Sequence, residues 1–159
     1  MNAHSNSGKV KSDTSAIEYT ETEFVPYSDK QLFNLITDVE RYPEFLPGWM
    51  SVDVISRDET SIAARQKIGV PLFNWEFDSR VALDRPRHIH VSAQDGPFHH
   101  LDIHWYLESV TRQMTKLTIT VEANMIEHAR SILNTFVEKS VHSLLEHFVL
   151  RAQEVYGDN

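Results

Sequence analysis

The feature that most constrains the fold of this chain is a long run, from Trp49 to Met125, in which apolar and polar side chains alternate. A repeat of two residues is typical of strands with one buried face and one solvated face. The stretch "LTITVEAN" is an example, because every second side chain in it is apolar. The pattern predicts six antiparallel strands, one after another. Turn-forming residues separate them at Asp58-Glu59, Gly69-Val-Pro71, Asp84-Arg-Pro86, Asp95-Gly-Pro97 and near Thr111.

One further strand and one helix are predicted before this run, and a second helix is predicted after it. Residues 17–27 are rich in β-favouring side chains and predict a first strand. Ser28 then has the properties of a helix N-cap, and Gln31 completes a capping box, so a helix should begin here. The segment from Glu127 to Tyr156 carries a single apolar stripe at helical spacing. It predicts an amphipathic helix of about 26 residues, roughly 40 Å long.

This order of elements predicts a single α+β domain: a curved, antiparallel, seven-stranded sheet around a long C-terminal helix, with a short helical segment after the first strand. The sheet must curve because strands twist, and the long helix is the element available to cover its apolar, concave face. One helix about 10 Å wide cannot fill that face completely. We therefore expect an apolar pocket between sheet and helix, with Ser79 as the one clear polar residue on the inward face.

The stretch "DVERYPEFLPGW", from Asp38 to Trp49, places three aromatic residues and two prolines in twelve positions. Proline has no N–H group and restricts the residue before it, so Pro43 and Pro47 predict a loop with at most one broken helical turn. An apolar loop of this kind either fills the core or closes a pocket and meets its ligand. The sequence leaves both alternatives open.

Length and composition limit the classes of protein to which the chain can belong. At 159 residues, 41% of them hydrophobic, the chain can bury one core. We expect residues 1–16, which are polar, to be a disordered leader and residues 17–156 to be a single folded domain. A net charge of −8 without a basic stripe argues against a nucleic-acid partner, and any membrane contact would have to rest on apolar insertion. The lack of cysteine suits a reducing cytoplasm.

Three stretches carry a resemblance to a known family: "VPYSDKQLFNLITDVERYPEFLPGW", "IGVPLFNWEFDSRVAL" and "DGPFHHLDIHWYLE". In this order, from about Tyr19 to Arg151, the chain resembles the coenzyme Q-binding family of the START and birch-pollen-allergen superfamily, which includes polyketide cyclases and dehydrases. The resemblance implies a helix-grip fold and a hydrophobic tunnel for a polyprenyl quinone such as ubiquinone, or a related lipid, bound in support of respiratory electron transport. Because the leader does not resemble a transit peptide, we expect a bacterial, cytoplasmic protein with peripheral contact at the inner membrane.

The predicted ligand-binding residues combine the aromatic loop with the inward face of the sheet and the long helix. They are Phe45, Leu46, Pro47, Trp49, Phe73, Trp75, Phe77, Phe98, Leu101, Trp105 and Phe136. An almost wholly apolar face offers no placed acid or base, so we predict no catalytic residue and no cofactor beyond the bound lipid. Two alternatives from the same superfamily remain open: a polyketide aromatase/cyclase, and a toxin that blocks association of the ribosomal subunits.

Several histidines gather on the predicted outer, solvated face of one hairpin. Imidazole and carboxylate groups on neighbouring strands could converge on a metal ion. Alternate histidines on a solvated strand need no special cause, however, and the resemblance implies no metal, so we predict none. His99 is expected to point inward, where it could hydrogen-bond a ligand oxygen. The residues on the outer face are His88, His90, His100, Asp102 and His104.

Overall fold

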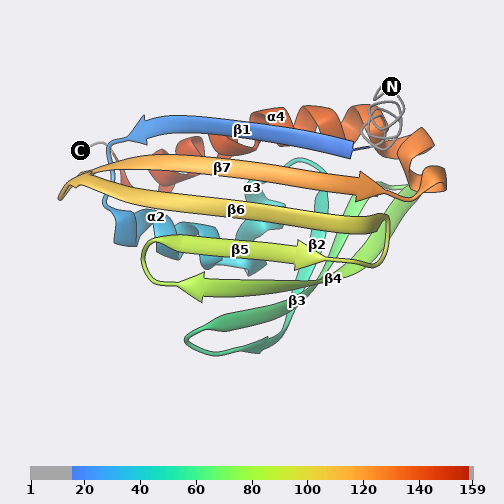
Figure 1. Cartoon of the computed structure of the whole chain (residues 1–159), viewed down its shortest axis with the longest axis horizontal. Coiled ribbons are helices and arrows are strands. Elements are labelled where there is room, and N and C mark those ends of the chain that lie inside the picture. Colours follow the sequence, from blue (N-terminus) through green and yellow to red (C-terminus); the bar gives the residue numbers. More distant parts are fainter. Residues whose placement is uncertain (1–15, 158–159) are drawn as a thin grey trace, which may run out of the picture.

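The computed structural model describes residues 16–157, apart from the side chains of residues 132–138 and 140–142. Residues 1–15 of the predicted leader lie outside this range. Within it, seven strands form one sheet in the order β1-β7-β6-β5-β4-β3-β2, and every pair of neighbours is antiparallel (Figure 1). The strands are β1 (Ala16–Val25), β2 (Trp49–Arg57), β3 (Ser61–Val70), β4 (Phe73–Asp84), β5 (His88–Ala93), β6 (Phe98–Thr111) and β7 (Met114–Met125).

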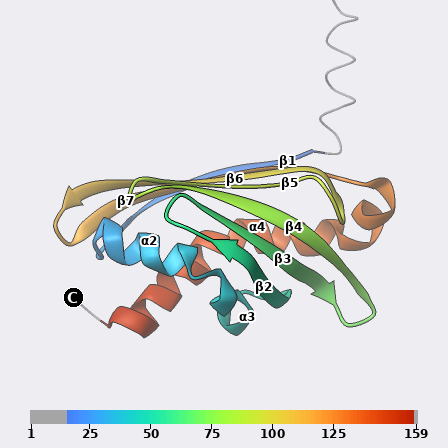
Figure 2. The same ribbon diagram turned by 90° about the horizontal axis from the view of Figure 1, so that it is seen from below.

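The helices all lie on one face of this sheet. Figure 2 shows them below the strands, with β2 and β3 curling toward them from the edge of the sheet. The predicted α+β helix-grip fold is therefore confirmed, including the six strands between Trp49 and Met125. The helical elements are α2 (Asp29–Thr37), the 3₁₀ turn η1 (Val39–Arg41), α3 (Tyr42–Phe45) and α4 (Glu127–Tyr156).

Hydrogen bonds near the start of α2 hold that helix and the C-terminal end of α4. The capping box is present as predicted: the Gln31 N–H donates to Ser28 Oγ (3.1 Å), and the Ser28 N–H donates to Gln31 Oε1 (2.9 Å). The same region holds the C-terminal end of α4, because the Tyr27 hydroxyl donates to the carbonyl oxygen of Gly157 (2.6 Å) and the Tyr156 hydroxyl to that of Gln31 (2.8 Å). The long helix is thus anchored across the concave face.

The segment after α2 is more helical than we predicted. Instead of one broken turn it forms η1 and then α3, which ends with a bond from the Leu46 N–H to the Tyr42 carbonyl (2.8 Å). Pro43 causes no break because it lies in the first turn of α3, where a helix does not use the missing N–H. Pro47 follows the end of α3 and therefore interrupts nothing. Tyr42 and Phe45 of the short helix both pack against Phe148 of α4.

A β-bulge changes the orientation of His99. The pairing of β6 with β7 shifts between Phe98 and His100, so the strict alternation that predicts an inward His99 fails at this point. Phe98 is buried and His99 is exposed. The prediction that His99 faces the pocket is therefore wrong.

We expect Gly96→Ala to lower the free energy of unfolding by about 2 kcal/mol or more, measured by urea denaturation. Gly96 has a φ of +62°, and an added Cβ would lie 2.3 Å from the Glu76 carbonyl oxygen. Gly157 is the matched control, because its φ is also positive (+79°) but a Cβ there would meet nothing within 4 Å. Equal costs for the two alanine variants would contradict the close approach of this turn to β4.

Candidate functional site

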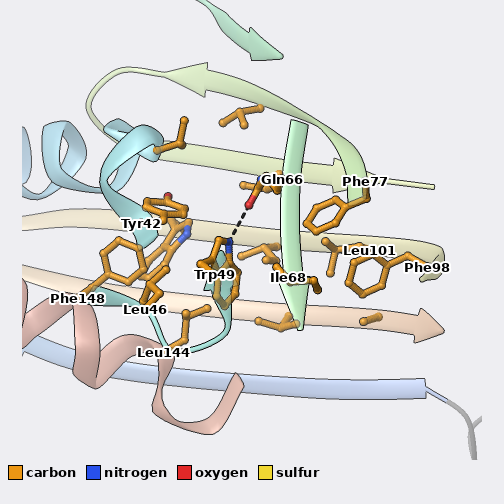
Figure 3. A pocket seen from close by; sticks show the side chains of 17 residues that line it. Tyr42, Leu46, Trp49, Gln66, Ile68, Phe77, Phe98, Leu101, Leu144 and Phe148 are labelled. Carbon is orange, nitrogen blue, oxygen red and sulfur yellow. Dashed lines mark hydrogen bonds between the residues drawn. The ribbon is translucent and has the colours of Figure 1, made fainter. Parts of the chain in front are cut away.

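A cavity of about 80 Å³ lies between the concave face of the sheet and the helical layer (Figure 3). Its lining is almost entirely apolar and comes from β2 to β7, from the η1 and α3 region, and from α4. We refer to it below as the cavity. The described residues that line it are Val39, Tyr42, Leu46, Trp49, Gln66, Ile68, Phe77, Val81, Val91, Phe98, Leu101, Ile103, Trp105, Val121, Ala123, Leu144 and Phe148.

Aromatic rings close one end of the cavity. The Phe148 ring of α4 makes edge-to-face contacts with Tyr42 (5.4 Å between centroids), Phe45 (5.1 Å) and Trp105 (4.9 Å). Tyr42 also contacts Trp49, at 6.5 Å. Edge-to-face pairs at these separations are favourable beyond the apolar area that they bury. Phe148 therefore joins α4 both to the 38–49 segment and to β6 at this end.

A row of polar groups crosses the sheet beside the cavity. The Trp49 Nε1–H donates to Gln66 Oε1 (2.7 Å), as the dashed line in Figure 3 shows. The Gln66 amide then donates to Ser79 Oγ (2.8 Å), and the Ser79 hydroxyl donates to the Ala64 carbonyl oxygen (3.2 Å). Gln66 and Ser79 are 4% and 1% exposed, so the row is inside the protein.

Within the described part of the chain, the hydrogen bonds of this row account for one of the two N–H groups of the Gln66 amide. A glutamine amide nitrogen carries two N–H groups, and only the bond to Ser79 is made by the Gln66 amide within the described residues. Gln66 is the one side-chain amide among the described residues that line the cavity. Tyr42 also lines the cavity, but its hydroxyl already donates to the Ile36 carbonyl oxygen. Burial, and to a smaller extent Asp38, raises the pKa of Tyr42, so this hydroxyl stays protonated at neutral pH.

Six of the predicted ligand-binding residues line the cavity. These are Leu46, Trp49, Phe77, Phe98, Leu101 and Trp105. Phe45 and Pro47 lie outside the lining: the Phe45 ring packs between Phe148 and the Arg151 guanidinium, and Pro47 is exposed. The side chain of Phe136 lies outside the described residues. Whether any of these residues touches a ligand stays a prediction.

Phe73 and Trp75 do not line the cavity, in contrast to our prediction. They lie on the predicted inward side of β4, but Phe73 is 49% exposed and Trp75 is half-buried. The reason is their position along the strand, because β4 pairs with β5 only from Arg80 to Asp84 and its first residues extend past the end of that pairing. Alternation predicts the face of a strand on which a residue lies but not how far it lies from the end of the sheet.

Gln66 is the functional candidate that the sequence reasoning missed. It follows Ile62 and Ala64 at the inward positions of β3, so the same alternation that singles out Ser79 would have placed its amide inside. Tyr42, Leu144 and Phe148 also line the cavity and were not among the predicted ligand residues, although their positions in the aromatic segment and on the helical stripe indicated burial.

The curved sheet, the long helix and the apolar cavity between them define a helix-grip protein of the class that binds hydrophobic ligands. The chain belongs to the family described as polyketide cyclase / dehydrase and lipid transport, whose model matches residues 25–149. The resemblance identified from the sequence is thereby confirmed at the level of the superfamily.

The named proteins to which this chain is similar carry the names of three different functions. The ribosome association toxin RatA of Vibrio cholerae is 30% identical over 146 residues, which cover 89% of this chain and 99% of the toxin. The mitochondrial coenzyme Q-binding protein COQ10 of Drosophila melanogaster is 32% identical over 78 residues, 49% of this chain and 32% of that protein. The crystal structure of the Zhui aromatase/cyclase from Streptomyces sp. R1128 has a TM-score of 0.74 at 18% identity, covering 87% of this chain and 94% of that one. At that identity the likeness concerns the fold alone.

Proposed function

We propose that the chain binds a polyprenyl quinone, with the quinone head in the cavity, and acts as a carrier of this lipid. The observation on which the proposal rests is the cavity itself: an apolar lining of sheet and helix residues that includes, among the described residues, a single side-chain amide, that of Gln66. Lipid pockets are typically apolar with a few polar groups that orient the ligand. A quinone has this composition, because its carbonyl oxygens only accept hydrogen bonds and its tail is hydrocarbon. The partial likeness to a coenzyme Q-binding protein supports the same ligand.

The described lining favours binding over catalysis. A cyclase needs an acid or base placed at the reacting atoms. Among the described lining residues there is no carboxylate or imidazole, and the Tyr42 hydroxyl is committed to a backbone carbonyl. The lining therefore supports a carrier more than an aromatase/cyclase.

The cavity must widen to accept this ligand. Pockets that enclose drug-sized molecules measure about 300–1,000 Å³, several times the 80 Å³ of this cavity. Phe148 and Leu144 of α4 form one wall, and the other wall is the sheet. We expect α4 or α3 to move outward when the quinone enters, because the strands of the sheet are held to one another by a ladder of hydrogen bonds and these helices are not part of that ladder.

A first test concerns the head group. We expect Gln66→Met to weaken quinone binding about tenfold, because the loss of one hydrogen bond to a buried carbonyl costs about 1.5 kcal/mol. Binding would be measured by titration of quinone against the fluorescence of the lining tryptophans. A polyprenyl hydrocarbon without carbonyl groups is the control ligand, and its affinity should not fall. Ser79→Ala is the control variant, because it changes the polar row without removing the Gln66 amide. An equal loss for both ligands would contradict a role for Gln66 in recognising the head.

We further propose that the carrier takes up quinone from a membrane through an exposed apolar surface. The β3–β4 turn exposes three apolar side chains, Val70 (41% exposed), Leu72 (86%) and Phe73 (49%). We call these residues the apolar tip. The tip begins two residues after Ile68, which lines the cavity, so it lies near the cavity along β3. The 45–49 segment is less suited to this role, because Leu46 is buried and Phe45 is packed against α4. No helix among the described residues is long and apolar enough to cross a membrane.

We expect the double variant Leu72→Ser, Phe73→Ser to slow quinone uptake from vesicles by at least tenfold while the fold and the affinity for quinone in detergent stay unchanged. Burial of roughly 100 Å² of apolar surface in a membrane is worth about 2.5 kcal/mol, and the serines lose that contribution. The control is Val110→Ser with Leu150→Ser, because both residues are exposed apolar groups away from the tip. Equal uptake by the two double variants would rule out the tip as the membrane contact.

The similarity to the Vibrio cholerae toxin over nearly its whole length favours a second candidate function, association with the ribosome. Sedimentation of the protein with purified ribosomal subunits through a sucrose gradient tests it. Migration of the protein with a subunit peak would support this function, and migration at the top of the gradient would exclude it under those conditions. Addition of quinone to the same gradients would show whether the two functions are linked.

A further inference from the structure

Side chains from three neighbouring strands converge on the outer face of the sheet, which is the face opposite the cavity. His90 of β5 lies directly across from His104 of β6, and Asp102 of β6 lies two residues before His104 on the same face. Asp102 in turn lies across from Glu122 of β7. The hydrogen-bonded pairing of the three strands therefore fixes the backbone positions of two histidines and two acidic residues, His90, His104, Asp102 and Glu122.

The donor atoms of this group are close together. His90 Nε2 is 2.5 Å from Asp102 Oδ1, and the rings of His90 and His104 are nearly parallel with their centroids 4.1 Å apart. One ligand atom from each of His90, Asp102 and His104 can be chosen so that all three lie within 4.8 Å of one another. Zinc bound at about 2.1 Å holds its ligand atoms roughly 3.4 Å apart. The three atoms are therefore near the required spacing, and rotation of the two stacked rings relative to each other would direct their nitrogens to one ion.

Neighbouring groups orient two of the three residues. His88 Nε2 lies 2.8 Å from His104 Nδ1, and this hydrogen bond leaves Nε2 of His104 for an ion. The second carboxylate oxygen of Asp102 lies 2.8 Å from His100 Nε2. Partners of this kind fix the ring orientation and tautomer of metal-binding histidines in known sites.

From this geometry we propose that His90, Asp102 and His104 bind one divalent transition-metal ion of the zinc class, and that His88 positions His104. Two nitrogen donors and one oxygen donor suit zinc and its neighbours rather than magnesium or calcium, and a water molecule would complete a tetrahedral shell. The side chains of His90 and Asp102 are only 32% and 23% exposed. Glu18 and Glu122 line the same surface hollow and add negative charge beside the ion. The site does not depend on the quinone proposal, since it lies on the other face of the sheet.

Isothermal titration of zinc chloride into the full chain, without an affinity tag and at neutral pH, tests the site. We expect one ion per chain with micromolar or tighter affinity, and no comparable heat with magnesium chloride. Asp102→Asn and His104→Asn should each weaken zinc binding at least tenfold. His99→Asn is the matched control, because His99 is an exposed histidine on β6, the strand of Asp102 and His104, but is not one of the proposed ligands. The zinc affinity of this variant should equal that of the unchanged protein.

A second variant separates positioning from direct binding. His88→Phe keeps a ring where His88 stacks on Tyr106 (4.9 Å between centroids) but removes the nitrogen that meets His104. We expect the His88→Phe variant to bind zinc about tenfold more weakly, still with one ion per chain. Loss of a residue that hydrogen-bonds to a metal ligand has an effect of this size in known sites. Zinc should also raise the melting temperature of the unchanged protein and of His99→Asn more than that of His104→Asn. Absence of zinc binding at micromolar concentration, or equal affinity in the Asp102→Asn, His104→Asn and unchanged proteins, would overturn the proposal.

Discussion

Replacement of Phe148 by alanine should lower the free energy of unfolding by about 3–5 kcal/mol, as is typical when a packed phenylalanine is truncated. The Phe148 side chain is 2% exposed and its ring contacts Tyr42 and Trp105 edge to face, so it connects α4 to α3 and to β6. Truncation would remove these contacts and enlarge the cavity beside them. Urea denaturation followed by circular dichroism measures the loss.

The matched control for this variant is Leu150→Ala. Leu150 is on the same helix, two residues away, but it is 52% exposed, so its truncation should cost less than about 1 kcal/mol. If Phe148→Ala cost no more than Leu150→Ala, the aromatic end of the cavity would not be a packed contact between α4 and the sheet. In that case the account of how the long helix is held would be wrong.

Ala123→Leu should weaken quinone binding at least a hundredfold while the protein stays folded. Ala123 lies on β7, is 2% exposed and lines the cavity, so a leucine there places three more carbon atoms where the ligand would lie. Because the cavity offers space for part of the larger side chain, the cost in folding free energy should be within the 1–3 kcal/mol typical of overpacking. Titration of quinone measures the affinity, and urea denaturation measures the stability.

Ala82→Leu is the control for this cavity-filling change. Ala82 is on β4 and exposed, so the same substitution there should change neither stability nor affinity by much. An Ala123→Leu protein that binds quinone as well as the Ala82→Leu protein would show that the ligand does not use the cavity. It would leave the hydrophobic space as a packing defect of the core.

The fold could be predicted from the sequence because its signals are periodic and local. Alternation with a period of two, broken by turn residues, indicates each strand and its buried face, and a single stripe at helical spacing indicates that the last helix covers a sheet. The cap at Ser28 could be predicted because its two reciprocal hydrogen bonds need only residues three apart.

The cavity could be predicted only in part, because it depends on features that alternation does not encode. The bulge at Phe98 reverses the orientation of the residue that follows, and nothing in the local pattern marks it. The depth of Phe73 and Trp75 depends on where the β4–β5 pairing ends, which is a property of two strands together. The same limit applies to the group around Asp102, since convergence of its partners depends on the register of three strands.

The central claim is that the cavity holds a polyprenyl quinone, and the most direct measurement is organic extraction of the freshly purified, full-length protein followed by mass spectrometry of the extract. Extraction of the Ala123→Leu protein, prepared in parallel, shows whether any lipid found comes from the cavity. The account predicts a polyprenyl quinone in near-stoichiometric amount with the unchanged protein and a large loss of it with Ala123→Leu. A protein that carries no quinone and takes up none when it is added, or one that carries equal amounts with and without the substitution, would contradict the account.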